Sequence, residues 1–153
     1  MSFTKQKVTR CFHAINQVIG LMFGFLIKKN YYIFIVTNQA GIAKNIFKEI
    51  DFINLHIYLK KKLSLKSIFF NDVQYSQYHP MGKIKKFKKN SPLRKPGNKM
   101  IKNIMSNWLI DKKNSFMIGD KLSDEKCALK SKINFNYVSD DFFKKIKKIV
   151  KKN

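Results

Sequence analysis

The stretch Tyr31–Gly41 reads YYIFIVTNQAG and changes character in its middle. The part Tyr31–Val36 is aromatic or β-branched, a composition typical of a strand that is buried on both faces. The part that follows, Thr37–Gly41, is polar or small and favours a turn. Strands buried on both faces occur mostly in parallel sheets covered by helices, so the stretch predicts an α/β fold with polar residues at the carboxyl end of a strand.

Further helices and strands alternate on either side of this stretch. Apolar periodicity predicts helices over residues 15–29, 48–63, 99–108 and 122–130, a lysine-rich helix at the carboxyl end, and strands over residues 67–75, 115–118 and 135–138. This alternation predicts a Rossmann-like parallel sheet with helices on both faces. We expect residues 1–153 to form a single domain, with the basic segment 76–98 as a loop excursion.

The charge of the chain is strongly one-sided. Its 153 residues carry a formal net charge of +23, which usually indicates nucleic acid or an anionic surface as partner. However, of the 32 basic residues only Arg10 and Arg94 are arginine, the residue that bidentate recognition favours. Lys, Asn, Ile and Phe, all encoded by A/T-rich codons, make up half the chain. We therefore interpret the lysine excess as mainly compositional and keep a basic nucleic-acid binder as the weaker alternative.

Other features favour a soluble protein. The longest apolar run, Val18–Ile27, is shorter than the roughly 20 residues that a membrane-spanning helix needs, so no membrane partner is expected. The two cysteines, Cys11 and Cys127, are too few for a disulfide framework, which fits a reducing compartment. A cytoplasmic protein is the expectation, and a monomer is the default for its oligomeric state.

Three polar segments follow or end apolar runs: Thr37–Gln39, Arg94–Gly97 and Gly119–Asp124. A hydroxyl and backbone N–H groups at a strand end can hold phosphoryl oxygens, and a lysine can neutralise their charge. An aspartate at a strand end can help to bind Mg²⁺. Each segment alone has a simpler interpretation as a turn, a basic surface or a helix cap. Their order along one chain favours a site for a phosphate ester.

The strings VTNQAGIAK from Val36, LRKP from Leu93 and MIGDKLSD from Met117 resemble the second, third and fourth motifs of the haloacid dehalogenase superfamily. Within it they are most similar to the D,D-heptose 1,7-bisphosphate phosphatases and the related histidinol-phosphate phosphatases. The resemblance implies a phosphoric monoester hydrolase whose ligand is a small sugar phosphate, with histidinol phosphate as the alternative. It also implies roles for nine residues: phosphoryl stabilisation by Thr37 and Lys95, substrate contacts by Asn38, Gln39, Ala40, Arg94 and Lys121, Mg²⁺ binding by Asp120, and support of that site by Asp124.

The first motif of this family, Asp-x-Asp-Gly-Thr, has no counterpart in the chain. In the family its first aspartate attacks phosphorus and its second acts as general acid and base. Here the first carboxylate is Glu49, residues 1–25 are divergent, and Val8–Phe12 is the sole candidate for the missing first strand. We therefore interpret the fold as truncated or altered at its amino end, with Mg²⁺ binding weak or lost and phosphatase activity negligible. A non-catalytic phosphate-binding pseudoenzyme is the alternative.

A second departure concerns zinc. Relatives with a structural zinc ion carry Cys-x-His and Cys-x-Cys before the Arg-Lys-Pro string. The matching positions here are Ser76, Tyr78, Ser91 and Leu93. Because these side chains cannot supply thiolate or imidazole ligands, no zinc is predicted, and His79 is interpreted as an ordinary loop histidine. We expect packing alone to hold the excursion.

Overall fold

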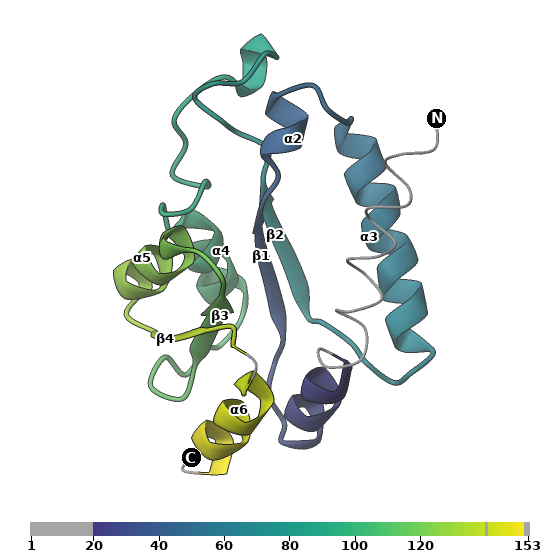
Figure 1. Cartoon of the computed structure of the whole chain (residues 1–153), viewed down its shortest axis with the longest axis vertical. Helices are drawn as coiled ribbons and strands as arrows, with labels where there is room; N and C mark the ends of the chain where they lie inside the picture. Colours follow the sequence, from purple (N-terminus) through teal and green to yellow (C-terminus); the bar gives the residue numbers. More distant parts are fainter. Residues whose placement is uncertain (1–19, 140, 152–153) are drawn as a thin grey trace.

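The computed structural model describes residues 20–139 and 141–151, and its helices and strands alternate along the chain (Figure 1). Residues 20–28 are helical, followed by β1 (Phe34–Asn38), α2 (Ala40–Ala43), α3 (Glu49–Ser64), β2 (Asp72–Ser76), the 3₁₀ turn η1 (Lys85–Phe87), α4 (Lys99–Asn107), β3 (Phe116–Gly119), α5 (Leu122–Ser131), β4 (Asn134–Tyr137) and α6 (Phe142–Lys151). The predicted α/β fold is confirmed. The candidate first strand Val8–Phe12 and the start of the predicted helix over residues 15–29 lie outside the described residues.

The strands form two parallel pairs. β1 pairs with β2, with Asn38 opposite Ser76, and β3 pairs with β4, with Gly119 opposite Tyr137. Between residues 20 and 139, and over 141–151, no further strand connects the two pairs. The parallel direction that the sequence predicted is confirmed, but in this part of the chain the sheet is divided into two.

The hydrogen bonds of β1 identify the edge that no strand of residues 20–139 and 141–151 covers. Ile33 O accepts from Asn71 N at 2.7 Å and Gln39 N donates to Ser76 O at 2.8 Å, so these alternate residues direct their backbone groups toward β2. Backbone groups point to opposite edges at successive residues of a strand, so those of Val36 point away from β2. There Val36 O accepts a hydrogen bond from Lys95 Nζ at 2.9 Å.

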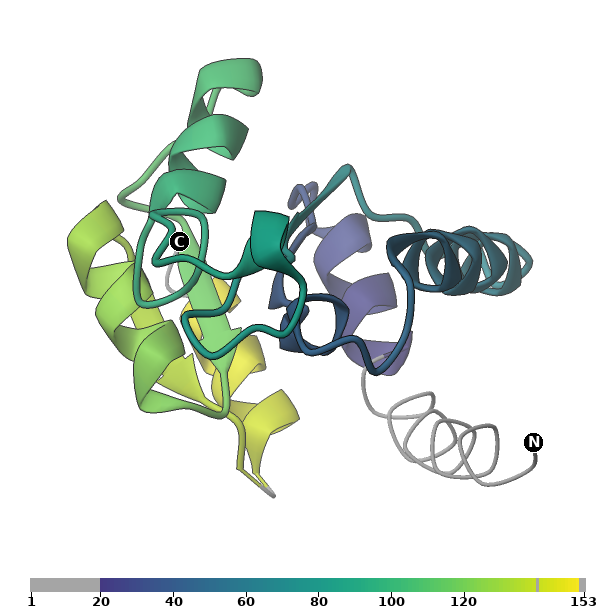
Figure 2. The ribbon, with the colours of Figure 1, turned by 90° about the horizontal axis from the view of Figure 1, so that it is seen from above.

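Helices cover both faces of the β1–β2 pair (Figure 2). On one face, the ring of Phe52 in α3 lies 4.6 Å from that of Tyr75 in β2. On the other face, Trp108, the residue after α4, lies 5.5 Å from Phe34 of β1. The main core cluster consists of Met22, Leu26, Ile33, Phe70, Ile146 and Val150. Partly buried side chains of both β1 and β3 pack against this cluster, so the two strand pairs share one core.

Several strand boundaries differ from the predicted ones, those of β1 and β2 most. Thr37 and Asn38 were expected after the strand, but they are its last residues because they still pair with β2. Residues 67–71, predicted as strand, precede β2, because Ser67 has a φ of 55° and Ile68 N closes a turn onto Leu63 O. None of the helices in the described ranges is long and apolar enough to cross a membrane.

Backbone hydrogen bonds attach the segment 76–98 to α2. Lys83 N and Ile84 N both donate to the carbonyl of Ala43, at 2.7 and 3.0 Å. Phe87 of this segment is buried in a small cluster with side chains of α2 and α3. The expectation that packing alone holds the segment is therefore wrong, because Ala43 ends α2 and its carbonyl is available to accept both bonds.

His56 of α3 lies in an apolar environment that disfavours its charged form. Its ring lies 5.6 Å from that of Phe52 and 5.1 Å from that of Phe70, and its buried Nε2 has no hydrogen-bond partner. Burial, and to a smaller extent the charge of Lys60, lowers the pKa of His56 below its usual value. The unfolded chain therefore binds this proton more readily than the folded chain.

We expect the free energy of unfolding to fall as the pH drops from about 7.5 to about 5.5, because a histidine with a lowered folded pKa stabilises the protein only while it is neutral. In His56→Gln this fall should be smaller, as measured by urea unfolding at both pH values. His79→Gln is the comparison: the pKa of His79 is also lowered, by burial, Arg94 and Lys44, so its replacement should reduce the fall too, but less, because its hydrogen-bonded side chain is more exposed. An unchanged pH dependence in His56→Gln would contradict the assignment.

Candidate functional site

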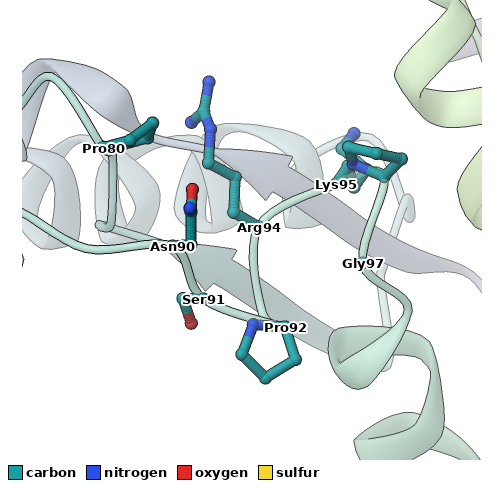
Figure 3. A pocket seen from close by; sticks show the side chains of 8 residues that line it. Pro80, Asn90, Ser91, Pro92, Arg94, Lys95 and Gly97 are labelled. Atoms are coloured by element: carbon teal, nitrogen blue, oxygen red, sulfur yellow. The ribbon is translucent and has the colours of Figure 1, made fainter.

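Lys95 lies at the centre of the candidate site (Figure 3). Its Nζ forms an ion pair with Oδ1 of Asp124 at 2.6 Å, and the two side chains are only 10% and 6% exposed. The same Nζ donates to Val36 O, so it joins the edge of β1 that faces away from β2 to the start of α5. The other carboxylate oxygen of Asp124 accepts from Lys121 N at 3.2 Å. An ion pair this buried, with further hydrogen bonds to both of its partners, fixes the position of the ammonium group.

Asn38 fixes the backbone of Lys95. Its Oδ1 accepts from Lys95 N at 2.9 Å, and its Nδ2 donates to Lys95 O at 3.1 Å. The family resemblance implied that Asn38 contacts substrate. Nothing in the sequence indicated its two hydrogen bonds to the backbone of Lys95. The amide has both of its hydrogen-bonding ends on Lys95, so in this structure it positions the lysine.

The other predicted residues surround this centre less tightly. Thr37 Oγ1 accepts from Gln39 Nε2 at 3.0 Å, and Ala40 begins α2 directly after them. The guanidinium of Arg94 donates to Tyr78 O at 3.3 Å. Asp120 and Lys121 are exposed between the end of β3 and the start of α5. The structure thus joins Asn38 to Lys95 and Lys95 to Asp124 by direct contacts. The other predicted residues lie on the same three segments: Thr37, Gln39 and Ala40 from the end of β1 to the start of α2, Arg94 on the loop of Lys95, and Asp120 and Lys121 just before α5.

Two hollows lie beside the loop that carries Lys95. The first, of about 410 Å³, is lined by Pro80, Asn90, Ser91, Pro92, Arg94, Lys95, Pro96 and Gly97 (Figure 3). The second, of about 380 Å³, has Tyr78, Ser91 and Leu93 in its wall, three of the positions that match zinc ligands in relatives. Within residues 20–139 and 141–151, no group of three or more His, Cys, Asp or Glu side chains could hold a metal ion.

Two further residues support the site, and neither was assigned a role in it from the sequence. Gly119 ends β3, and a Cβ added there would lie 2.5 Å from Cβ of Asp124, so only glycine lets this carboxylate approach the strand. Cys127 of α5 is fully buried, and its thiol donates to Gly97 O at 3.2 Å. A possible signal for Cys127 was its spacing of three residues from Asp124, which places both on one face of α5.

Comparison with known proteins agrees with this arrangement. Residues 83–138 match the family model described as haloacid dehalogenase-like hydrolase. The D-glycero-beta-D-manno-heptose-1,7-bisphosphate 7-phosphatase of Rhodopseudomonas palustris is 32% identical over 121 residues, which cover 78% of this chain and 67% of the relative. The enzyme of the same name from Photorhabdus laumondii is 36% identical over 122 residues, with coverages of 80% and 64%. The chain thus spans about two thirds of the length of these relatives.

Solved structures show the same fold. The D,D-heptose 1,7-bisphosphate phosphatase of B. bronchiseptica, crystallised with magnesium and phosphate, superposes with a TM-score of 0.74 at 15% identity, covering 88% of this chain and 82% of that structure. At this level of identity the likeness concerns the fold, while the sequence matches above carry the relationship. The fold, the matched motifs and the relatives together show that the chain belongs to the haloacid dehalogenase-like hydrolases.

Proposed function

We propose that the site binds the phosphoryl group of a sugar phosphate, and that the ligand is D-glycero-D-manno-heptose 1,7-bisphosphate. The observation that carries this proposal is the buried Lys95 ammonium, fixed by Asp124 and by Val36 O beside the polar end of β1. A fixed cation that reaches the strand end carrying a threonine hydroxyl suits phosphoryl oxygens. The names of the relatives support heptose bisphosphate as the ligand. Such a protein would act in carbohydrate metabolism, and we expect it in the cytoplasm.

Hydrolysis of this ester breaks the bond between phosphorus and the sugar oxygen while a nucleophile bonds to phosphorus. Lys95 and Thr37 can stabilise the charge on the phosphoryl oxygens, and Asp124 and Asn38 hold Lys95 in place. No Asp or Glu precedes Glu49 in these 153 residues, so the segment before β1 supplies no carboxylate that could attack phosphorus. Since coupled catalytic groups lose most of their effect when one is missing, we propose that these 153 residues bind the ligand without turning it over.

Magnesium would be held mainly by Asp120. Both oxygens of Asp124 already have partners, Lys95 Nζ and Lys121 N, whereas Asp120 is exposed at the end of β3. Mg²⁺ is commonly bound by one or two carboxylates together with water and phosphate oxygens, so a single aspartate fits a weak site that needs the ligand's phosphate. When bound, the ion would neutralise negative charge on the phosphoryl oxygens. We propose that Mg²⁺ strengthens phosphate binding and has low affinity alone.

Calorimetry with the heptose bisphosphate, histidinol phosphate and orthophosphate tests the proposal, together with an assay of phosphate release. We expect heptose bisphosphate to bind most tightly and no release above background. Thr37→Val should weaken binding about tenfold or more, because one hydrogen bond to a charged phosphoryl oxygen is lost. Ser106→Ala, which removes a hydroxyl on the exposed side of α4, should change nothing.

Two results would contradict the proposal. Absence of binding by all three ligands would refute a phosphate site, and turnover by the purified chain would refute the non-catalytic assignment. If histidinol phosphate binds most tightly, the proposed phosphate site stands, but heptose bisphosphate is wrong as its ligand.

A further inference from the structure

Helix α5 contacts the loop that carries Lys95 at three points, spaced along one face. Asp124 Oδ1 pairs with Lys95 Nζ at 2.6 Å, Cys127 Sγ donates to Gly97 O at 3.2 Å, and Lys130 O accepts from Asn98 Nδ2 at 2.8 Å. The α5 residues are three positions apart, so each contact lies about one helical turn after the last. The loop follows the helix over this distance.

The opposite side of the loop is held by β1. Asn38 binds both backbone groups of Lys95, and Lys95 Nζ reaches Val36 O. α5 packs on β3 and β4, whereas β1 pairs only with β2, and the described residues contain no strand between these pairs. Through its hydrogen bonds to β1 and to α5, the loop therefore connects the β1–β2 pair with the helix that packs on β3 and β4.

The loop has little room to shift. Gly97 N donates to Arg94 O at 2.7 Å and Lys99 N to Pro92 O at 3.1 Å, which closes the loop at its base. A Cβ at Gly97 would lie 2.3 Å from Pro92 O, so the backbone at Gly97 packs directly against the carbonyl of Pro92. A displacement of Gly97 O is thus transmitted to Lys95, two residues away.

From these contacts we infer that Cys127 is a positioning residue for the phosphate site: its thiol holds Gly97 O and thereby sets the position of the Lys95 ammonium. The inference rests on the proposed phosphate-binding function. The thiol is suited to this task because burial raises the pKa of Cys127, so its proton is retained for donation. The side chain is fully buried, and the hydrogen bond that it donates to Gly97 O is the only one that the structure describes for it.

The test compares three variants of the full chain. Cys127→Ala removes the donor, Cys127→Ser supplies a hydroxyl donor in its place, and Ser131→Ala is the matched control. Ser131 is buried on the same helix, but its hydroxyl donates to Cys127 O within α5 and does not contact the loop. The two readouts are the affinity for orthophosphate by calorimetry and the hydrogen exchange of the Gly97 amide by NMR.

We expect Cys127→Ala to weaken orthophosphate binding about three- to tenfold and to speed exchange at Gly97, the effect of one lost hydrogen bond. Cys127→Ser should restore both readouts, and Ser131→Ala should leave both unchanged while lowering stability. The Raman S–H band that the wild type shows and Cys127→Ala lacks should be that of a hydrogen-bonded thiol.

Unchanged Gly97 exchange in Cys127→Ala, or equal losses of affinity in Cys127→Ala and Ser131→Ala, would overturn the inference. If the wild type binds none of the three phosphate ligands, the proposed function fails, and Gly97 exchange with the Raman band still decides whether Cys127 holds the loop.

Discussion

Replacing Lys95 by methionine is expected to lower the free energy of unfolding by about 3–5 kcal/mol, because it leaves the Asp124 carboxylate buried without its cation. Both partners are nearly buried, at 10% and 6% exposure, so solvent cannot replace the lost interaction. Val36 O would lose its hydrogen-bond donor at the same time. Urea unfolding of the wild type and Lys95→Met at one pH measures the difference.

The double variant Lys95→Met with Asp124→Leu should recover much of this loss, since a buried ion pair replaced by apolar side chains of similar volume often costs little. Lys144→Met is the matched control, because Lys144 forms its ion pair with Asp141 at 3.3 Å on the surface, with both side chains more than 70% exposed. It should leave stability unchanged. Equal effects of Lys95→Met and Lys144→Met would refute a structural role for the buried pair.

Gly119→Ala is expected to destabilise the protein by about 1–3 kcal/mol through overpacking at the site. The new Cβ would lie 2.5 Å from Cβ and 2.6 Å from Oδ2 of Asp124. To make room, the carboxylate must leave the position in which it pairs with Lys95 Nζ, so phosphate binding should weaken together with stability. Urea unfolding and orthophosphate calorimetry on the same preparation measure the two effects.

Gly24→Ala provides the control for this glycine. Gly24 lies in the helix over residues 20–28, and nothing lies within 4 Å of an added Cβ. Alanine is a better helix former, so this variant should be more stable by about 0.5–1 kcal/mol. A Gly119→Ala variant as stable as the wild type would contradict the close packing of Asp124 against Gly119 in β3.

Much of the fold could be predicted because the spacing of apolar residues indicates which segments form helices and which form strands. The run ending at Val36 and the amphipathic stretch starting at Lys99 correspond to β1 and α4 with small shifts. The ends of strands were harder. Thr37 and Asn38 look like turn residues, but pairing with β2 extends the strand through them, and pairing depends on a partner distant in the sequence.

The candidate site shows a similar limit. Lys95 and Asp124 were expected to lie in one site, and the structure places them in contact. The contacts with Val36 O and Gly97 O could not be predicted, because every residue has a carbonyl and only the folded backbone decides which one faces a donor. The roles of Thr37, Arg94, Asp120 and Lys121 toward a ligand stay predictions.

The hydrogen bond from Lys95 to Val36 O also bears on how separate molecules avoid one another. An open strand edge with unpaired carbonyls can recruit a strand from another molecule, and proteins commonly protect such edges with lysine. Here the ammonium occupies an acceptor on the edge of β1 that faces away from β2. No strand of the described residues covers this edge, and Lys95 occupies one acceptor that an added strand would need, so we expect its loss to favour aggregation of the folded chain in addition to unfolding.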